Sequence, residues 1–265
     1  MKRFMKNFYV YLLYFFLYVP ILVLIAYSFN AGRSRALWEG FSFHWYTELF
    51  KNTAVLKSFY NTILVGVIST VIATIIGTIG AIGLYNSNSK IKKWVMDLNY
   101  LPILNPDIVI AISLVALYNF MRLRFGYLTL ILSHVSFLTP YVLFNVMPRL
   151  MTMDPNLYEA AIDLGANRKQ AFRMVVLPEI KPGIWSGALM AFTLSIDDFV
   201  VSFFTTGSGV QNISITVWSM AKRGVNPVLN ALSAIMFIIM VALVVGIYFR
   251  NKKEQVKRYE KVKDI

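Results

Sequence analysis

The chain has 265 residues, of which 57% are hydrophobic, and its mean hydropathy is +0.60. This is too apolar for a soluble protein of this length and is typical of a membrane protein with several spans. It has no cysteine and only two histidines, which excludes disulfides and thiolate metal sites and leaves too few ligands for an ordinary zinc site. The net charge of +13 comes from basic residues beside hydrophobic runs, so it indicates a membrane surface rather than nucleic acid as partner.

Six hydrophobic runs are long enough to cross a membrane, since a spanning helix needs roughly 20 apolar residues. They lie at about 9–29, 62–84, 98–120, 127–147, 184–204 and 228–249. We expect the first run to be a retained helix rather than a signal peptide, because no small-residue cleavage site follows it. The runs are too closely spaced for a separate soluble domain. The sequence therefore predicts one all-α integral membrane domain over residues 1–265, with six transmembrane helices.

Lysine and arginine set the expected orientation of these helices. With both termini in the cytoplasm, the inner segments hold 18 of these residues and the outer segments hold 8, as the positive-inside rule requires. The loop at 148–183 and the basic tail at 250–265 are then cytoplasmic, and the segment at 205–227 is an outer loop. We therefore expect a multi-pass protein with both ends inside and membrane lipid around it.

The loop at 148–183 is polar and charged, and it predicts two short helices hinged at a glycine. Asp154 can cap the first helix, whose apolar stripe falls at i, i+3, i+4 and i+7. The members of this stripe are Leu157, Ala160, Ala161 and Leu164. Gly165 can end the helix in a left-handed conformation, and Asn167 can cap the next one, which Pro178 is expected to stop. The two alanines would let another surface approach the backbone closely.

This loop resembles the cytoplasmic "EAA" loop of the permease subunits of ABC importers. The pattern is met by Glu159-Ala160-Ala161, Gly165, Val175 and Leu177-Pro178, with valine in place of the usual isoleucine. The resemblance implies that Glu159, Ala160, Ala161 and Gly165 belong to a coupling helix that docks on an ATPase subunit. It also implies the type I ABC importer permease fold (MetI-like). On the residues alone, an ordinary amphipathic pair of cytoplasmic helices gives the same pattern.

Three acids fall within the predicted spans: Asp107, Asp197 and Asp198. A charged side chain at the membrane centre costs roughly 2.5–3.5 kcal/mol on insertion scales, so each acid is a candidate functional residue. Asp107 follows Pro106 at a broken helix start. Neighbouring residues point about 100° apart on a helix, so we expect one of Asp197 and Asp198 to face a cavity, with Asp198 the preferred candidate. The alternative for each is a satisfied buried carboxylate that holds a helix break.

Carboxylates together with aromatic faces suit small organic cations, because a protonated amine gains from charge pairing and from cation–π contact. Tyr141 and Trp218 are the aromatic residues that we expect on such a path. The spans have no lysine or arginine at their centres, which argues against an anionic substrate.

Two further stretches, Pro102–Val109 and Leu194–Gly207, resemble the PotC-type permease subunits of spermidine/putrescine importers, and the similarity covers essentially the whole chain. It implies a subunit of a bacterial cytoplasmic membrane importer for polyamines. The implied partners are a second, homologous permease, two ATPase subunits and an extracellular polyamine-binding protein. ATP and Mg would be bound by the ATPase, so we expect no cofactor in this chain, which has no Walker-type glycine loop.

No catalytic set is convincing, and we expect no enzyme activity of this chain itself. Ser133 and His134 are adjacent in sequence, but neighbours on a helix diverge and no third orienting residue is apparent. An intramembrane hydrolase using this pair is the alternative from another class, and it would act without an ATPase. A permease of the same family for iron(III) or another solute is the alternative within transport. A secondary transporter would carry an internal repeat, which the sequence does not show.

Overall fold

The computed structural model describes residues 2–33, 37–223, 227–242 and 245, and in these ranges its regular elements are all helices, with one isolated antiparallel bridge between Asn30 and Phe41. The predicted all-α class is therefore confirmed for the described residues. The chain divides into two compact units, Leu56–Thr216 on the one hand and Met1–Val55 with Val217–Ile265 on the other. Each unit is described by itself.

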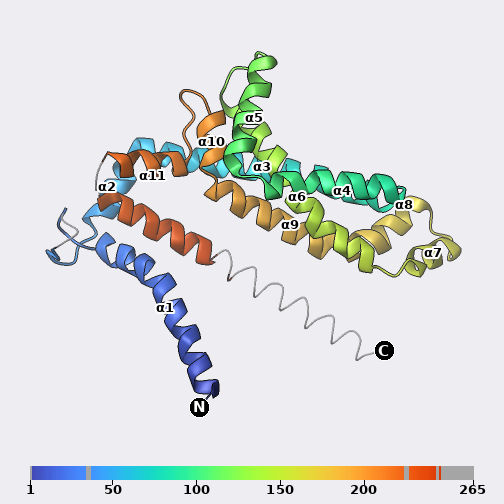
Figure 1. Cartoon of the computed structure of the whole chain (residues 1–265), viewed down its shortest axis with the longest axis horizontal. Helices are drawn as coiled ribbons and strands as arrows, with labels where there is room; N and C mark the ends of the chain where they lie inside the picture. The colour runs from blue at the N-terminus through green and yellow to red at the C-terminus, as the bar shows by residue number, and fades with distance from the viewer. Residues whose placement is uncertain (1, 34–36, 224–226, 243–244, 246–265) are drawn as a thin grey trace. The chain divides into compact units, whose positions relative to one another are not determined.

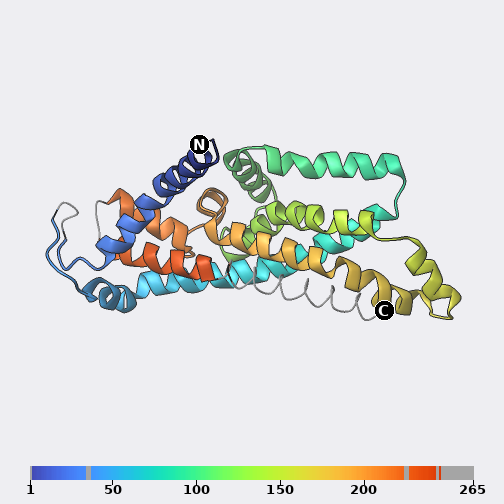
Figure 2. The same ribbon diagram turned by 90° about the horizontal axis from the view of Figure 1, so that it is seen from below.

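The core of the Leu56–Thr216 unit is the pair of helices α6 (Tyr127–Thr152) and α9 (Leu177–Asp197), which lie side by side in both views (Figures 1 and 2). The buried face of α6 repeats every four residues, and that of α9 is made largely of small side chains. The α6 members are Leu138, Val142, Val146 and Leu150, and the small α9 members are Gly183, Gly187 and Ala191. Small residues at this spacing let two membrane helices approach through their backbones.

Helix α3 (Thr53–Tyr85), with 33 residues, is the longest of the described helices, and it too packs through small side chains. A Cβ built on Gly77 would lie 2.8 Å from the Cβ of Val142 on α6, so only glycine fits there without a shift. Ser69 donates a hydrogen bond of 3.4 Å to the carbonyl of Ile131, also on α6. The glycine-rich second run is thus a packing face inside its unit.

The third predicted span is not one straight helix. The chain forms α4 (Ser89–Leu104) and α5 (Asp107–Phe120), which meet at a bend of 107° (Figure 1). Pro106 cannot donate a backbone hydrogen bond and disfavours helical backbone in Asn105 before it, and Asn105 is accordingly extended, with ψ of 144°. The interruption predicted from the prolines is therefore found at Pro106, whereas the angle between the two helices could not be predicted from hydropathy.

The fifth predicted span is also broken. Helix α9 ends at Asp197, Asp198 is extended with ψ of 124°, and the short helix α10 (Val200–Thr205) follows. The segment at 205–227, expected to be a loop, contains helix α11 (Ile213–Lys222). The break between α9 and α10 follows Asp197 and contains Asp198 and Phe199, and its polar groups are described with the site.

The polar loop folds into two short helices that lie at one end of the α6–α9 pair (Figures 1 and 2). They are α7 (Asn156–Asp163) and α8 (Arg168–Ala171). Asn167 caps α8 as predicted, accepting from Gln170 N at 3.0 Å. Pro178 does not stop the second helix, contrary to expectation, since a π-helical turn η1 (Phe172–Val176) continues it into α9. The wider turn accommodates the missing donor and the ring of the proline.

The second unit contains α1 (Lys2–Ser28) and α2 (His44–Lys51). The link between them is held by Asn30, whose side chain bonds Leu37 O and Glu39 N, both at 2.8 Å, while its carbonyl accepts from Trp45 Nε1 at 2.7 Å. Phe29, Phe41, Phe43 and Tyr46 form an aromatic cluster with neighbouring ring centroids 5.2–6.0 Å apart.

Three helices in the described part of the chain are long and apolar enough to cross a membrane, and a fourth span results if the bent α4–α5 pair counts as one. The three are Phe8–Ser28 within α1, then α3 and α6. A shorter apolar helix, Pro227–Ala242, covers the first part of the sixth predicted span. Most of residues 243–249, and the basic tail at 250–265, lie outside the described residues.

Candidate functional site

The break between α9 and α10 is organised by the carboxylate of Asp198. This side chain is only 7% exposed. Its two oxygens accept backbone hydrogen bonds from the first turn of α10, at 3.1 Å from Val201 N and at 2.7 Å from Ser202 N. A carboxylate in this place satisfies donors that a helix start leaves unpaired and interacts favourably with the positive end of the helix dipole. Asp198 therefore caps α10.

His134 of α6 reaches the same break from the side. Its Nδ1 lies 2.7 Å from the hydroxyl oxygen of Ser195 on α9, and its Nε2 lies 3.0 Å from that of Ser202 on α10. The same Nε2 is 3.5 Å from Asp198 Oδ2. The histidine is 1% exposed, and both serines are buried. One imidazole thus joins the helix before the break to the helix after it.

The backbone groups at the end of α9 are also paired, by residues that follow α10. Asn212 donates from Nδ2 to the carbonyl of Asp198 at 3.1 Å, and Ser214 donates to the carbonyl of Ile196 at 3.3 Å. Asn212 also accepts from Ile215 N at 2.9 Å, within the first turn of α11. A break in a membrane helix is tolerated where its freed backbone groups find such partners.

Asp197, one residue earlier, is in a different situation. Its side chain is exposed, and within the described part of the chain it makes no hydrogen bond or salt bridge. A free carboxylate against lipid is expensive, so this side chain must meet water, a substrate or another subunit. The sequence favours Asp198 over Asp197 as the acid that faces a cavity. In the structure, Asp198 is a buried cap and Asp197 is an exposed acid.

The other predicted path residues are distributed over both units. Asp107 is exposed at the first residue of α5, and Tyr141 of α6 is half-buried. Trp218 lies on α11, in the part assigned to the other unit. Its ring is covered by the ammonium of Lys222, 5.1 Å from the ring centroid.

The Ser133–His134 pair proposed for a hydrolase is not assembled. Ser133 donates to Thr129 O at 2.7 Å and shares a hydrogen bond of 2.9 Å with the hydroxyl of Tyr118, whereas His134 bonds Ser195 and Ser202 instead. Ser133 and His134 are both buried, so a substrate has no access to them. Among the described residues, no group of three or more histidine, aspartate or glutamate side chains could hold a metal ion.

The predicted coupling helix is α7, and it is open to solvent in this chain. Leu157 is 47% exposed and Leu164 is 89% exposed; Glu159 and Ala160 are exposed as well, and Ala161 is half-buried. Gly165 follows with φ of +90°, the left-handed backbone predicted for it. An apolar stripe whose two leucines are this exposed is a surface available for docking.

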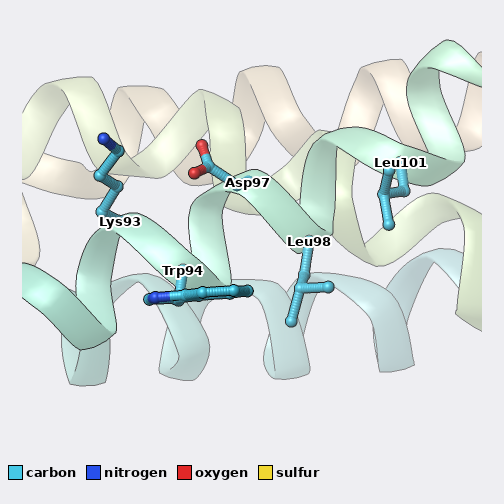
Figure 3. A pocket seen from close by; sticks show the side chains of 5 residues that line it. All are labelled: Lys93, Trp94, Asp97, Leu98 and Leu101. Carbon is cyan, nitrogen blue, oxygen red and sulfur yellow. The ribbon is translucent and has the colours of Figure 1, made fainter.

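A shallow pocket of about 410 Å³ lies on α4, and Figure 3 shows the side chains that line it. They are Lys93, Trp94, Asp97, Leu98 and Leu101. None of the predicted site residues belongs to it.

The sequence does not predict the role of His134 in holding the break between α9 and α10. Its two serine partners lie 61 and 68 positions along the chain, so no local spacing of residues indicates the contact.

Comparison with known proteins places these features in context. Residues 73–252 match the family model described as binding-protein-dependent transport system inner membrane component. The chain is 37% identical over 244 residues to the spermidine/putrescine transport system permease protein PotC of Haemophilus influenzae, covering 92% of this chain and 95% of that protein. It is 36% identical over 234 residues to PotC of Escherichia coli K12, covering 88% and 89%. It is 35% identical over 231 residues to the putrescine transport system permease protein PotI of the same organism, covering 83% and 81%.

Two solved structures share the fold. One is a bacterial ABC transporter involved in import of the acidic polysaccharide alginate, with a TM-score of 0.70 at 18% identity, covering 93% of this chain and 97% of that one. The other is a bacterial alginate ABC transporter in complex with an alginate pentasaccharide-bound periplasmic protein, with a TM-score of 0.67 at 19% identity, covering 92% and 94%. At this identity the likeness concerns the fold alone.

Proposed function

The chain belongs to the family of binding-protein-dependent transport system inner membrane components, and on this premise we propose that it is a permease subunit of an ATP-driven importer of spermidine and putrescine. The observation that carries the proposal is the similarity, at 35–37% identity over more than four fifths of the chain, to permeases named for these polyamines. Transport, and not catalysis by this chain, is the role of the family.

In the proposed arrangement six spans cross a bacterial cytoplasmic membrane with both termini inside. The bent α4–α5 pair and the broken α9–α10 pair each count as one span, and the apolar helix Pro227–Ala242 begins the sixth. The lysine and arginine distribution supports this orientation. It places α7 and α8 in the cytoplasm, where an ATPase can reach them.

The working complex that we propose has a second, homologous permease, two ATPase subunits and an extracellular polyamine-binding protein. ATP and Mg are bound by the ATPase subunits, and this chain carries no cofactor. When ATP closes the ATPase pair, the two coupling helices move together and the spans rock to open the cavity outward. The polyamine then passes from the binding protein to the permeases, and ATP hydrolysis and release reopen the cavity inward.

The proposed substrate path uses the exposed acids Asp107 and Asp197 with the phenol of Tyr141. Ammonium groups gain from carboxylates and from aromatic faces. No lysine or arginine lies at 107–120, 127–148 or 183–205 to oppose them. Trp218, whose ring already faces Lys222, is the weaker aromatic candidate.

The test is uptake by the complete complex in proteoliposomes. Labelled spermidine and putrescine should accumulate only when ATP, the partner ATPase and the binding protein are all present. A complex whose ATPase cannot hydrolyse ATP serves as the control. If the complex takes up iron(III) or another solute but no polyamine, the substrate assignment is wrong, and uptake without the ATPase would remove the importer assignment as well.

A further inference from the structure

We propose that Asp198 and His134 form a positioning lock for the break between α9 and α10, and that the lock presents Asp197 as the acid of this pair that meets the polyamine. The inference rests on the proposed function and goes beyond it by assigning a structural role to Asp198 and a substrate-binding role to Asp197. The lock consists of His134, Ser195, Asp198 and Ser202.

The first argument is that Asp198 has little capacity left for a substrate. Its two oxygens already accept from Val201 N and Ser202 N, and Oδ2 faces the imidazole of His134. With 7% of its side chain exposed, an ammonium group could reach it only by displacing these partners. A buried carboxylate satisfied in this way is a structural group.

The second argument is the position of His134 across the break. Ser195 lies in the last turn of α9, and Ser202 lies in the first turn of α10. Because the two ring nitrogens of one histidine hold one serine each, the direction of α10 relative to α9 is fixed from α6. These contacts on both sides of the break indicate that His134 holds the two helices in place rather than binding a substrate.

The third argument is the contrast with Asp197. The backbone carbonyls on both sides of it are held, that of Ile196 by Ser214 and that of Asp198 by Asn212. Its own carboxylate has no hydrogen bond or salt bridge to the described chain and is exposed. The main chain around Asp197 is therefore fixed while its charge is free, which is the preorganisation that a binding group requires.

The experiment exchanges charge and length at the two positions and measures polyamine uptake by the complete complex. At Asp198 an acceptor matters more than the charge; asparagine, a good helix cap, keeps one of the two oxygen acceptors that the start of α10 uses. We expect Asp198→Asn to keep at least about a third of the uptake and Asp198→Glu to lose about tenfold, because the longer side chain does not fit the closed cap. At Asp197 the charge matters, so Asp197→Asn should lose about tenfold and Asp197→Glu should recover most of that loss.

Assembly is measured beside uptake by co-purification of the second permease and the ATPase. A loss of assembly in Asp198→Asn also supports the lock, because it places the role of this residue in the fold. A fully assembled Asp198→Asn complex that loses uptake tenfold overturns the proposal. So does an Asp197→Asn complex with normal uptake, or an Asp197→Asn complex that fails to assemble, since the acid would then pair with another subunit.

A third variant tests the histidine. His134→Leu removes both serine partners and should reduce the maximal uptake rate and the thermal stability of the complex, while the substrate concentration for half-maximal uptake stays unchanged. A changed half-maximal concentration would make His134 a substrate residue and overturn its positioning role. Failure of the wild-type complex to take up polyamines would instead reject the proposed function, so the two failures are distinguishable.

Discussion

The backbones of α6 and α9 touch where Gly183 faces Asn145. A Cβ built on Gly183 would lie 2.7 Å from the carbonyl oxygen of Asn145 and 2.9 Å from Cγ of Arg149. Backbone oxygen cannot move aside as the end of a flexible side chain can. This contact therefore sets how closely the two central helices of the unit approach.

We predict that Gly183→Val destabilises the folded chain by about 1–3 kcal/mol, the usual cost of overpacking a well-packed site. The measurement is the thermal transition of the purified complex in detergent, together with its abundance in the membrane. Gly83→Val is the matched control, because nothing lies within 4 Å of a Cβ at that position on α3. Equal transition temperatures for the two variants would contradict the close approach.

The docking surface on α7 leads to a second prediction. Ala161 belongs to the apolar stripe and is half-buried, whereas Asp163 is exposed and points about 160° away from Ala161 on the helix. A large charged side chain on the stripe should prevent docking, so Ala161→Arg should abolish ATPase co-purification and uptake while the permease remains in the membrane. Asp163→Arg introduces the same side chain off the stripe and should leave ATPase association largely intact. If Ala161→Arg associates normally, α7 does not dock through this stripe.

The orientation of the chain leads to a third prediction, for which the absence of native cysteine removes any background from this subunit. Thr47→Cys on α2 and Arg168→Cys on α8 are exposed positions. An impermeant thiol reagent should label Thr47→Cys in intact cells and Arg168→Cys only after permeabilisation. The reverse labelling pattern would place α7 outside and exclude its contact with an ATPase.

Local features of the fold were predictable from the sequence because their causes are local. The left-handed backbone of Gly165 and the capping role of Asn167 depend on residues within one or two turns, and both were found as expected. The continuation past Pro178 was missed because no pattern in the sequence marks the π-helical turn that carries the helix past the proline. The proline at position 106 predicted an interruption of the helix, but the sequence did not predict the angle of the bend.

The sequence identified the acidic residues of the site but did not predict which of them is buried and which is exposed. The sequence marks Asp197 and Asp198 as costly acids, and helical spacing separates their directions. It does not reveal that His134, Asn212 and Ser214 complete the break, since these lie in other elements. Burial of one of two adjacent carboxylates is a tertiary property.

The last prediction concerns the anchoring of the segment before α11 onto α3. The hydroxyl of Thr62 accepts the backbone N–H of Ile213 at 2.7 Å, and both residues are buried. Thr62→Val keeps the shape but removes the acceptor, and an unsatisfied buried donor costs about 1–3 kcal/mol. We expect a lower thermal transition and faster hydrogen exchange in the peptide around Ile213. Thr193→Val is the matched control because its hydroxyl bonds only Leu189 O of its own helix, and it should change neither quantity appreciably. Unchanged exchange around Ile213 in Thr62→Val would show that this segment is held by other contacts.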